Sequence, residues 1–254
     1  MAERSAPADA FGRAAREYEL GRPEWPGELI DRVVGELGLE SGAVVVDLGA
    51  GTGKLTRALV PRFARVLAVE PDAAMRAVLE EVVPGAETVV GNAEAIPLEA
   101  DSVDAVFSAE AFHWFSTRAT LDEISRVLRP GGGLAIFWNI PGEEIEPPLS
   151  DEAEAFIGEA FRRGGSPGLP RVLSGEWREP FADSAFEELR KESVRRDIAS
   201  DRETFVANML SVSSIAVQPD ADRAAFAERL RELVPDGIYR RPFETVAYWT
   251  RLAG

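Results

Sequence analysis

A glycine-rich turn directly after an apolar run is the first stretch whose residue types suggest chemistry. The run ends near Asp47, and Gly49, Gly51 and Gly53 follow it in a Gly-x-Gly-x-Gly spacing, with Ala50 between the first two. Glycines let backbone N–H groups approach a ligand that any Cβ would exclude. The turn therefore predicts a site for a nucleotide-like cofactor, and a purely structural turn is the competing interpretation.

Two later apolar runs also end in polar groups, at positions that a parallel sheet would bring to the same edge. Glu70 closes the second run and is followed by Pro71. A carboxylate there lies within reach of a ribose held on the first turn and can accept from both vicinal hydroxyls. Asn92, Ala93 and Glu94 follow the third run. An asparagine amide beside a backbone N–H can bind the edge of an adenine, although the same residues also suit an ordinary loop.

Composition excludes several classes of function. The chain has 28 Lys+Arg against 44 Asp+Glu, a formal net charge of −16. Because such a field repels phosphate backbones and anionic lipids, we expect neither nucleic acid nor membrane as a partner. Cysteine is absent and His113 is the only histidine, so no thiolate or multi-histidine metal site is expected. With no apolar leader and no run of about 18 apolar residues, the sequence predicts a cytoplasmic protein.

The pattern of apolar residues predicts the elements that must position these groups. Between residues 41 and 140, nearly continuous apolar runs alternate with segments that carry an apolar stripe of helical period. Such runs are typical of parallel strands covered on both faces, joined by right-handed crossovers. The sequence therefore predicts an α/β fold with a doubly wound, mostly parallel sheet. The expected strands are residues 43–48, 65–70, 87–90, 104–108 and 134–139.

The flanking regions differ from this core. Residues 1–40 show no strand pattern, and 26–39 predict an amphipathic helix. We expect a single domain with an N-terminal arm over the cofactor (1–40), a cofactor-binding core (41–140) and an acceptor-pocket region (141–254). For the last region the patterns predict helices at 151–163, 201–210 and 223–233, a loop at 164–170, and strands at 186–197 and 246–252.

Taken together, the motifs resemble class I S-adenosylmethionine-dependent methyltransferases. The similar segments are Asp-Leu-Gly-Ala-Gly-Thr-Gly at 47–53, Val-Glu-Pro at 69–71, Asn-Ala-Glu-Ala-Ile-Pro-Leu at 92–98 and Arg-Val-Leu-Arg-Pro-Gly-Gly at 126–132. Residues 11–26 and Ala-Phe-His-Trp-Phe at 111–115 are similar to the small-molecule branch called type 11, which includes trans-aconitate methyltransferase-like proteins. The shared motifs run from residue 11 to about 139, roughly half of the chain.

The resemblance implies a seven-stranded Rossmann-like sheet with an N-terminal helical arm and C-terminal helical insertions. It also implies S-adenosyl-L-methionine as cofactor, S-adenosyl-L-homocysteine as product and no metal. Glu70 would bind the ribose, Asn92 and Ala93 the adenine, and Tyr18 and Arg22 the methionine end. Many relatives have Asp where this chain has Asn92. The residues expected at the cofactor are Tyr18, Arg22, Asp47, Gly49, Ala50, Gly51, Gly53, Glu70, Pro71, Asn92, Ala93, Glu94, Glu110 and Phe112.

The expected reaction is direct in-line transfer of a methyl group to a small molecule, with O-methylation of a carboxylate or hydroxyl favoured. His113 is a candidate general base, and a positioning or structural role is the alternative. A carboxylate acceptor would need no base. Aromatic faces suit a sulfonium and its methyl group. The residues expected to line the acceptor pocket are Trp25, His113, Trp114, Trp138, Asn139 and Tyr248.

Two other functions stay open. An NAD(P)-dependent oxidoreductase would use a similar turn, but Lys54 stands where the dinucleotide fingerprint has its third glycine. A non-catalytic regulatory protein that binds S-adenosylmethionine is also compatible with the sequence, because methyl transfer requires no particular catalytic side chain.

Overall fold

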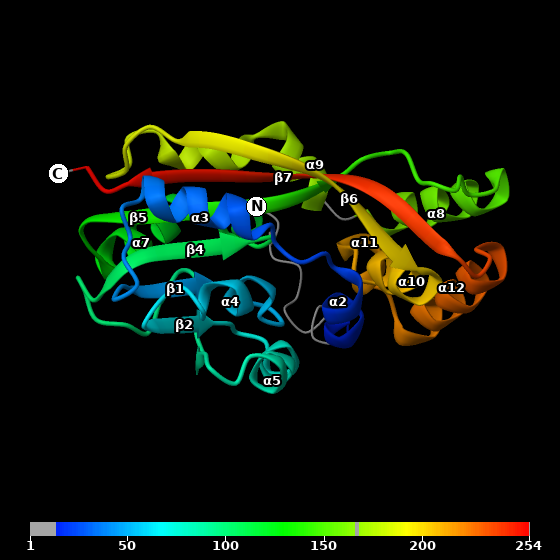
Figure 1. The fold of residues 1–254 in the computed structure, drawn as a ribbon, viewed down its shortest axis with the longest axis horizontal. Coiled ribbons are helices and arrows are strands. Elements are labelled where there is room, and N and C mark those ends of the chain that lie inside the picture. The colour runs from blue at the N-terminus through cyan, green and yellow to red at the C-terminus, as the bar shows by residue number, and fades with distance from the viewer. Residues whose placement is uncertain (1–13, 166–167, 254) are drawn as a thin grey trace.

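A seven-stranded sheet forms the centre of the molecule in the computed structural model, which describes residues 14–165 and 168–253. Its strand order is β3-β2-β1-β4-β5-β7-β6 (Figure 1). The first five strands are parallel, whereas β7 is antiparallel to both β5 and β6. The predicted doubly wound, mostly parallel sheet is confirmed. The strands are β1 (Val44–Leu48), β2 (Arg65–Val69), β3 (Glu87–Val89), β4 (Val103–Ala109), β5 (Leu128–Pro141), β6 (Arg190–Asp201) and β7 (Ile238–Arg251).

Helices cover both faces of this sheet and also gather beyond one end of it. In the described ranges they are α2 (Ala15–Gly21), α3 (Gly27–Glu36), α4 (Lys54–Leu59), α5 (Ala73–Val82), α6 (Phe112–Phe115), α7 (Arg118–Val127), α8 (Asp151–Gly164), α9 (Gly168–Ser174), the 3₁₀ helix η1 (Glu176–Phe181), α10 (Arg202–Leu210), α11 (Ser213–Ala216) and α12 (Asp220–Leu233). None of these helices is long and apolar enough to cross a bilayer.

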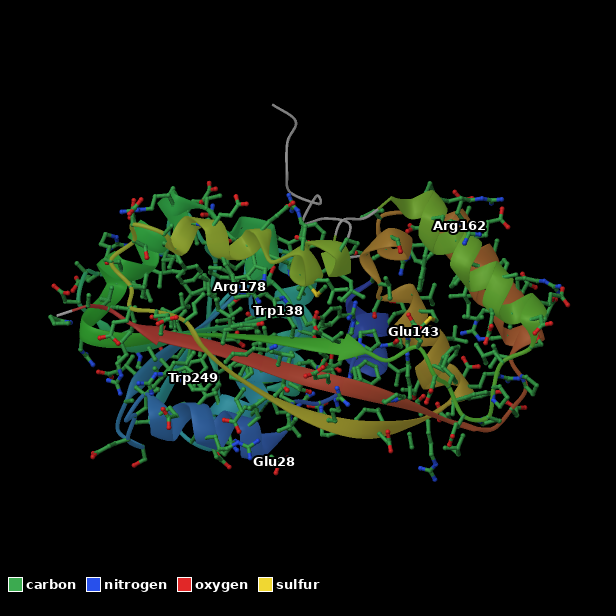
Figure 2. The ribbon with its side chains drawn as sticks, turned by 90° about the horizontal axis from the view of Figure 1, so that it is seen from above. Glu28, Trp138, Glu143, Arg162, Arg178 and Trp249 are labelled. Atoms are coloured by element: carbon green, nitrogen blue, oxygen red, sulfur yellow. The ribbon has the colours of Figure 1, made fainter. Side chains whose placement is uncertain are left out.

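Successive strand residues enter two different apolar layers. Val45 and Phe137 pack under α3 and α4, whereas Val46 and Trp138 pack under α7 and η1. This alternation follows from the pleat, which points neighbouring side chains to opposite faces. Trp138 and Trp249 accordingly lie on opposite faces of the sheet (Figure 2).

A third apolar cluster lies outside the sheet, where α8, α10, α11 and α12 pack together. These helices form a separate group at the right of Figure 1, and β6 and β7 extend into it from the sheet. We call this group the helical lobe. The lobe projects past the strand ends of the parallel core (Figure 1).

Several element boundaries differ from those predicted. β6 is shifted, since it spans Arg190–Asp201 instead of 186–197, and β7 is longer than predicted, since it already begins at Ile238. The predicted loop at 164–170 is partly helical, because α9 begins at Gly168. Pro170 lies in the first turn of that helix, where its missing N–H removes no helical hydrogen bond. The capping residue of α10 is Asp201, whose carboxylate accepts from the backbone N–H of Thr204.

Candidate functional site

The glycine turn joins β1 to α4, and Glu70 at the end of β2 braces it. Gly49, Gly51 and Gly53 all have positive φ angles (72°, 57° and 86°), a region in which other residues are strained. The backbone N–H of Gly51 donates to Glu70 Oε2 and that of Asp72 donates to Oε1, each at 2.9 Å. Burial raises the pKa of Glu70, while these two donors favour its charged form. The carboxylate therefore fixes the turn at the sheet edge.

A cavity of about 500 Å³ opens above this turn. It brings together most of the residues expected at the cofactor, although they come from five separate segments of the chain. Its apolar wall includes Met75 and also Phe115, which belongs to the aromatic motif at 111–115. The expected residues that line it are Tyr18, Gly49, Gly51, Glu70, Pro71, Asn92, Ala93, Glu94 and Glu110.

Ion pairs fasten the N-terminal arm to the start of α4. Glu19 accepts from Thr52 Oγ1 at 2.7 Å and from Arg57 at 2.9 Å. Glu24 accepts from Lys54 Nζ at 2.8 Å and from Arg57 at 2.6 Å. Lys54 thus has a structural partner where a dinucleotide fingerprint has glycine. Glu19 and Glu24 were not expected at the site, because nothing local in the sequence marks a carboxylate that pairs across some thirty residues of chain.

A second cavity, of about 530 Å³, lies between the sheet edge and the helical lobe. Tyr18, Glu110 and Trp114 line both cavities, so the two meet at these three side chains. The expected acceptor residues His113, Trp114, Trp138 and Asn139 line the second cavity. The lobe supplies Phe161, Asn208 and Met209, and β7 supplies Arg241.

Two guanidinium groups face the second cavity. Arg22 donates to Ser211 through Nε (2.9 Å, to Oγ) and Nη2 (3.1 Å, to the carbonyl), and it lies over the ring of Tyr18 at 5.3 Å. Arg241 donates from Nε to the carbonyl of Gly142 at 2.7 Å, and burial lowers its pKa. Among the residues that the structure describes, no carboxylate lies within 4.0 Å of either group. Both cations are therefore available to an anion.

Glu110 has an unusual backbone at the junction of the cavities. Its φ is 55°, a value uncommon for a side chain other than glycine. Its Oε1 accepts from the backbone N–H of Asn139 at 2.7 Å. Burial raises the pKa of Glu110, and the positive charge of Arg22 acts in the opposite direction. The strained turn thus places a carboxylate where the two cavities meet.

His113 is buried at the back of the second cavity. Its Nδ1 accepts from the indole N–H of Trp138 at 3.1 Å. Burial, together with the positive charges of Arg171 and Arg22, lowers the pKa of His113 to about 3. The imidazole is therefore neutral at physiological pH.

Three aromatic residues expected at the site lie elsewhere, and these assignments are corrected. Trp25 packs edge-on against Phe137 in the layer under α3. Phe112 is fully buried against Trp177 on the other face. Tyr248 accepts from Arg178 Nη2 at 2.6 Å in a separate surface groove. Aromatic type alone did not indicate which face of the sheet each ring would occupy.

Four other residues expected at the cofactor do not line the first cavity. Asp47 is buried and accepts from Thr56 Oγ1 at 2.6 Å, so it ties β1 to α4 without lining either cavity. Ala50 and Gly53 pack toward Leu79 of α5. Arg22 lines the second cavity rather than the first.

Asn92 uses its amide oxygen within its own loop. Oδ1 accepts from the backbone N–H groups of Glu94 (3.0 Å) and Ala95 (2.9 Å). The expected contact between this oxygen and an adenine amino group would therefore compete with two existing hydrogen bonds. Asn92 nevertheless shapes the loop that forms one wall of the first cavity.

Comparison with known proteins identifies the class to which this arrangement belongs. A model of the methyltransferase domain family matches residues 46–136. An uncharacterized methyltransferase of Mycobacterium tuberculosis is 41% identical over 167 residues, which cover 66% of this chain and 65% of the relative. One of Schizosaccharomyces pombe is 30% identical over 223 residues, 86% of each chain. The match thus spans just under two thirds of the mycobacterial relative.

A solved structure from Anaeromyxobacter dehalogenans, described as a candidate type II methyltransferase, shares the fold with a TM-score of 0.64. Its sequence is 26% identical, and the match covers 91% of this chain and 97% of the Anaeromyxobacter chain. The malonyl-[acyl-carrier protein] O-methyltransferase of Methylococcus capsulatus is 46% identical over 134 residues, which cover 50% of this chain and 48% of that enzyme. The chain belongs to the class I S-adenosylmethionine-dependent methyltransferase family.

Proposed function

We propose that this protein transfers the methyl group of S-adenosylmethionine to the oxygen of a small-molecule acceptor. The observation that carries the proposal is the pair of cavities that meet at Tyr18, Glu110 and Trp114. An in-line displacement needs a cofactor and an acceptor in adjacent spaces, aligned within about 3–3.5 Å and shielded from water. The two cavities have this relation.

The first cavity fits the cofactor by its shape and by its donor set. A Cβ built on Gly51 would meet no atom within 4 Å, so the turn leaves open space at the cavity wall. Glu70 would hold the ribose hydroxyls, the loop from Gly91 to Glu94 would hold the adenine, and Tyr18 would close over the methionine end. When bound, S-adenosylmethionine supplies a methyl carbon activated by a sulfonium.

The second cavity fits an acceptor that is anionic at one end and apolar at the other. Arg22 and Arg241 provide the positive charge on its polar side. Leu169 and Leu173 of α9 line it while remaining 41% and 61% exposed, which gives an apolar rim. The relative from Methylococcus capsulatus, by its name, methylates an oxygen of a malonyl group. We therefore favour a carboxylate acceptor over a hydroxyl.

Incubation with radiolabelled S-adenosylmethionine and fractionated small-molecule extract tests this proposal. We expect label in an acidic fraction, and alkali should release it because methyl esters hydrolyse. An alkali-stable label would instead indicate an ether or N- or C-methylation. Absence of label in every fraction, in a protein that binds S-adenosylhomocysteine, would indicate a binding protein without transferase activity.

A further inference from the structure

The hydrogen bond between Trp138 and His113 defines which nitrogen of the imidazole carries the proton. An indole N–H can only donate, so the Nδ1 that receives it at 3.1 Å must present a lone pair. In the neutral ring the proton then lies on Nε2. Because Trp138 is itself buried in the sheet between Trp177 and Tyr248, the indole has little freedom to release this bond.

Three groups near His113 disfavour a second proton on its ring. β5 contributes the indole N–H of Trp138, and α9 contributes Arg171, whose Nη1 lies 3.5 Å from the His113 carbonyl. Arg22, the residue directly after α2, adds a second positive charge. Protonation of Nδ1 would set two N–H groups against each other, close to two guanidinium groups. The low pKa of His113 agrees with this geometry.

Nε2 is on the side of the ring toward the second cavity. It lies 3.8 Å from the position that a Cβ on Gly168 would occupy, and Gly168 lines the same cavity. Within the described residues, no hydrogen bond takes up the proton on Nε2. A Cβ at residue 168 would also lie only 2.9 Å from Ser213 Oγ, so a side chain there would crowd this N–H, and the glycine avoids that.

We propose that His113 binds the acceptor by donating its Nε2–H to an acceptor oxygen, and that Trp138 is the positioning residue that holds the ring in this form. His113 is therefore not the general base. This inference rests on the proposed function, and it favours an acceptor whose reacting oxygen has already lost its proton, such as a carboxylate. That oxygen supplies the electron pair of the new O–C bond, and the pair of the breaking C–S bond goes to sulfur. No proton is released, so no base is required.

Nuclear magnetic resonance can read this tautomer directly, because His113 is the only histidine. The protein would be ¹⁵N-labelled and free of any histidine tag, and long-range ¹H–¹⁵N spectra would be recorded between about pH 5 and 8, around the ordinary histidine pKa near 6.5. We expect a bare Nδ1, a protonated Nε2 and no titration. A proton on Nδ1, or a titration near the ordinary value, would overturn the proposal.

A pair of variants tests the role of the N–H in the reaction. In His113→Gln the amide nitrogen reaches the position of Nε2, whereas in His113→Asn it reaches only that of Nδ1. With the acidic extract fraction as acceptor, we expect His113→Gln to stay within about tenfold of wild type in kcat/KM and His113→Asn to lose about 10- to 100-fold, as for a hydrogen bond to a charged group.

Equal losses of about 10²- to 10⁴-fold in both variants would instead indicate a general base and overturn the proposal. A wild-type protein that labels no fraction would contradict the proposed function, and the spectra would still decide the tautomer. The variant Trp138→Phe provides a further check, since loss of the indole donor should let a second tautomer appear. A spectrum unchanged by that substitution would show that Trp138 does not hold the ring.

Discussion

Asp47 is a buried carboxylate with one oxygen bonded and one without a partner. Thr56 donates to Oδ2, whereas Oδ1 has no hydrogen-bond partner among the described residues. Burial raises the pKa of Asp47 from its ordinary 3.8 to about 7, and the charge of Glu70 adds to this effect. The ionised form is therefore costly in the folded protein.

This cost gives Asp47→Asn a pH-dependent effect on stability. Between about pH 4 and 7 the folded protein keeps a proton on Asp47 that the unfolded chain has released, so the contribution of Asp47 to stability falls as the pH rises. The variant loses this dependence. Relative to wild type, its free energy of unfolding should rise from about pH 5 to about pH 8 by a few kcal/mol, at about 1.4 kcal/mol per pKa unit. Urea denaturation at both pH values measures this, and a constant difference would contradict the shift.

Glu70 acts on both the turn and the ligand that we assign to it. Glu70→Ala removes the acceptor of two backbone N–H groups and the anchor for the ribose. The affinity for S-adenosylhomocysteine should fall about tenfold or more, the loss of a charge-assisted hydrogen bond, while the protein still folds. Titration calorimetry measures the affinity. Glu70→Gln, which keeps the size and one oxygen, should lose less, and an unchanged affinity in Glu70→Ala would refute the ribose assignment.

Among single residues, the sequence predicted those whose placement depends on the backbone. It missed those whose placement depends on which way the side chain points. Gly49, Gly51 and Glu70 were expected to lie together at one sheet edge, and they do, because a turn and a strand end locate them there. Trp25 and Phe112 were misplaced, because the strand or helix phase that turns a ring inward was not fixed by local pattern. Arg241 was missed because it comes from the end of β7 that the sequence did not predict as strand.

Among the elements, α2 depends on α10 for its position. A Cβ on Gly21 would lie only 2.1 Å from the backbone nitrogen of Asn208, so the two helices touch at their backbones. Asn208 Nδ2 donates to the carbonyl of Gly21 at 2.9 Å and strengthens this contact. Since α2 carries Tyr18 and leads directly to Arg22, the lobe positions both residues.

Gly21→Ala should therefore displace α2 without disrupting the sheet. We expect a loss of affinity for S-adenosylhomocysteine of about tenfold or more, because Tyr18 moves away from the first cavity, with cooperative unfolding retained. Gly35→Ala is the matched control, since Gly35 lies on the exposed side of α3 and a Cβ there would meet nothing within 4 Å. It should leave affinity unchanged and add about 0.5–1 kcal/mol to helix stability. Equal affinities in the two variants would contradict the dependence of α2 on α10.

The elements themselves were largely predictable in the parallel core and less so beyond it. Buried parallel strands are nearly continuously apolar and stand out, as in β1 and β4. In β6 exposed and half-buried residues alternate along an edge strand rich in charge, including Arg190 and Lys191, so its apolar signal is weak. The long pairing of β6 with β7 is a contact between distant segments that local patterns do not reveal.

For the whole molecule, ligand binding and stability are linked. S-adenosylhomocysteine should raise the melting temperature, because it binds the folded state selectively. At a ligand concentration of a hundred times Kd, the free energy of unfolding should increase by about 2.7 kcal/mol. NADH should give no shift, because Lys54 is paired with Glu24 where a dinucleotide site has glycine. A calorimetric or fluorescence melt measures both, and a shift with NADH alone would favour an oxidoreductase.

Residues 202–237 form α10, α11 and α12 of the helical lobe, and the two ends of this segment meet in the sheet. Asp201, the last residue of β6, pairs with Ile238, the first residue of β7, so residues 202–237 leave and return at neighbouring positions. Residues 202–237 can therefore be replaced as a unit during evolution without a change in the register of β6 and β7 or in the turns that follow β1 and β2. Preference for a new acceptor can change through the cavity residues of this segment, such as Asn208 and Met209, provided that the replacement keeps a helix backbone in contact with Gly21.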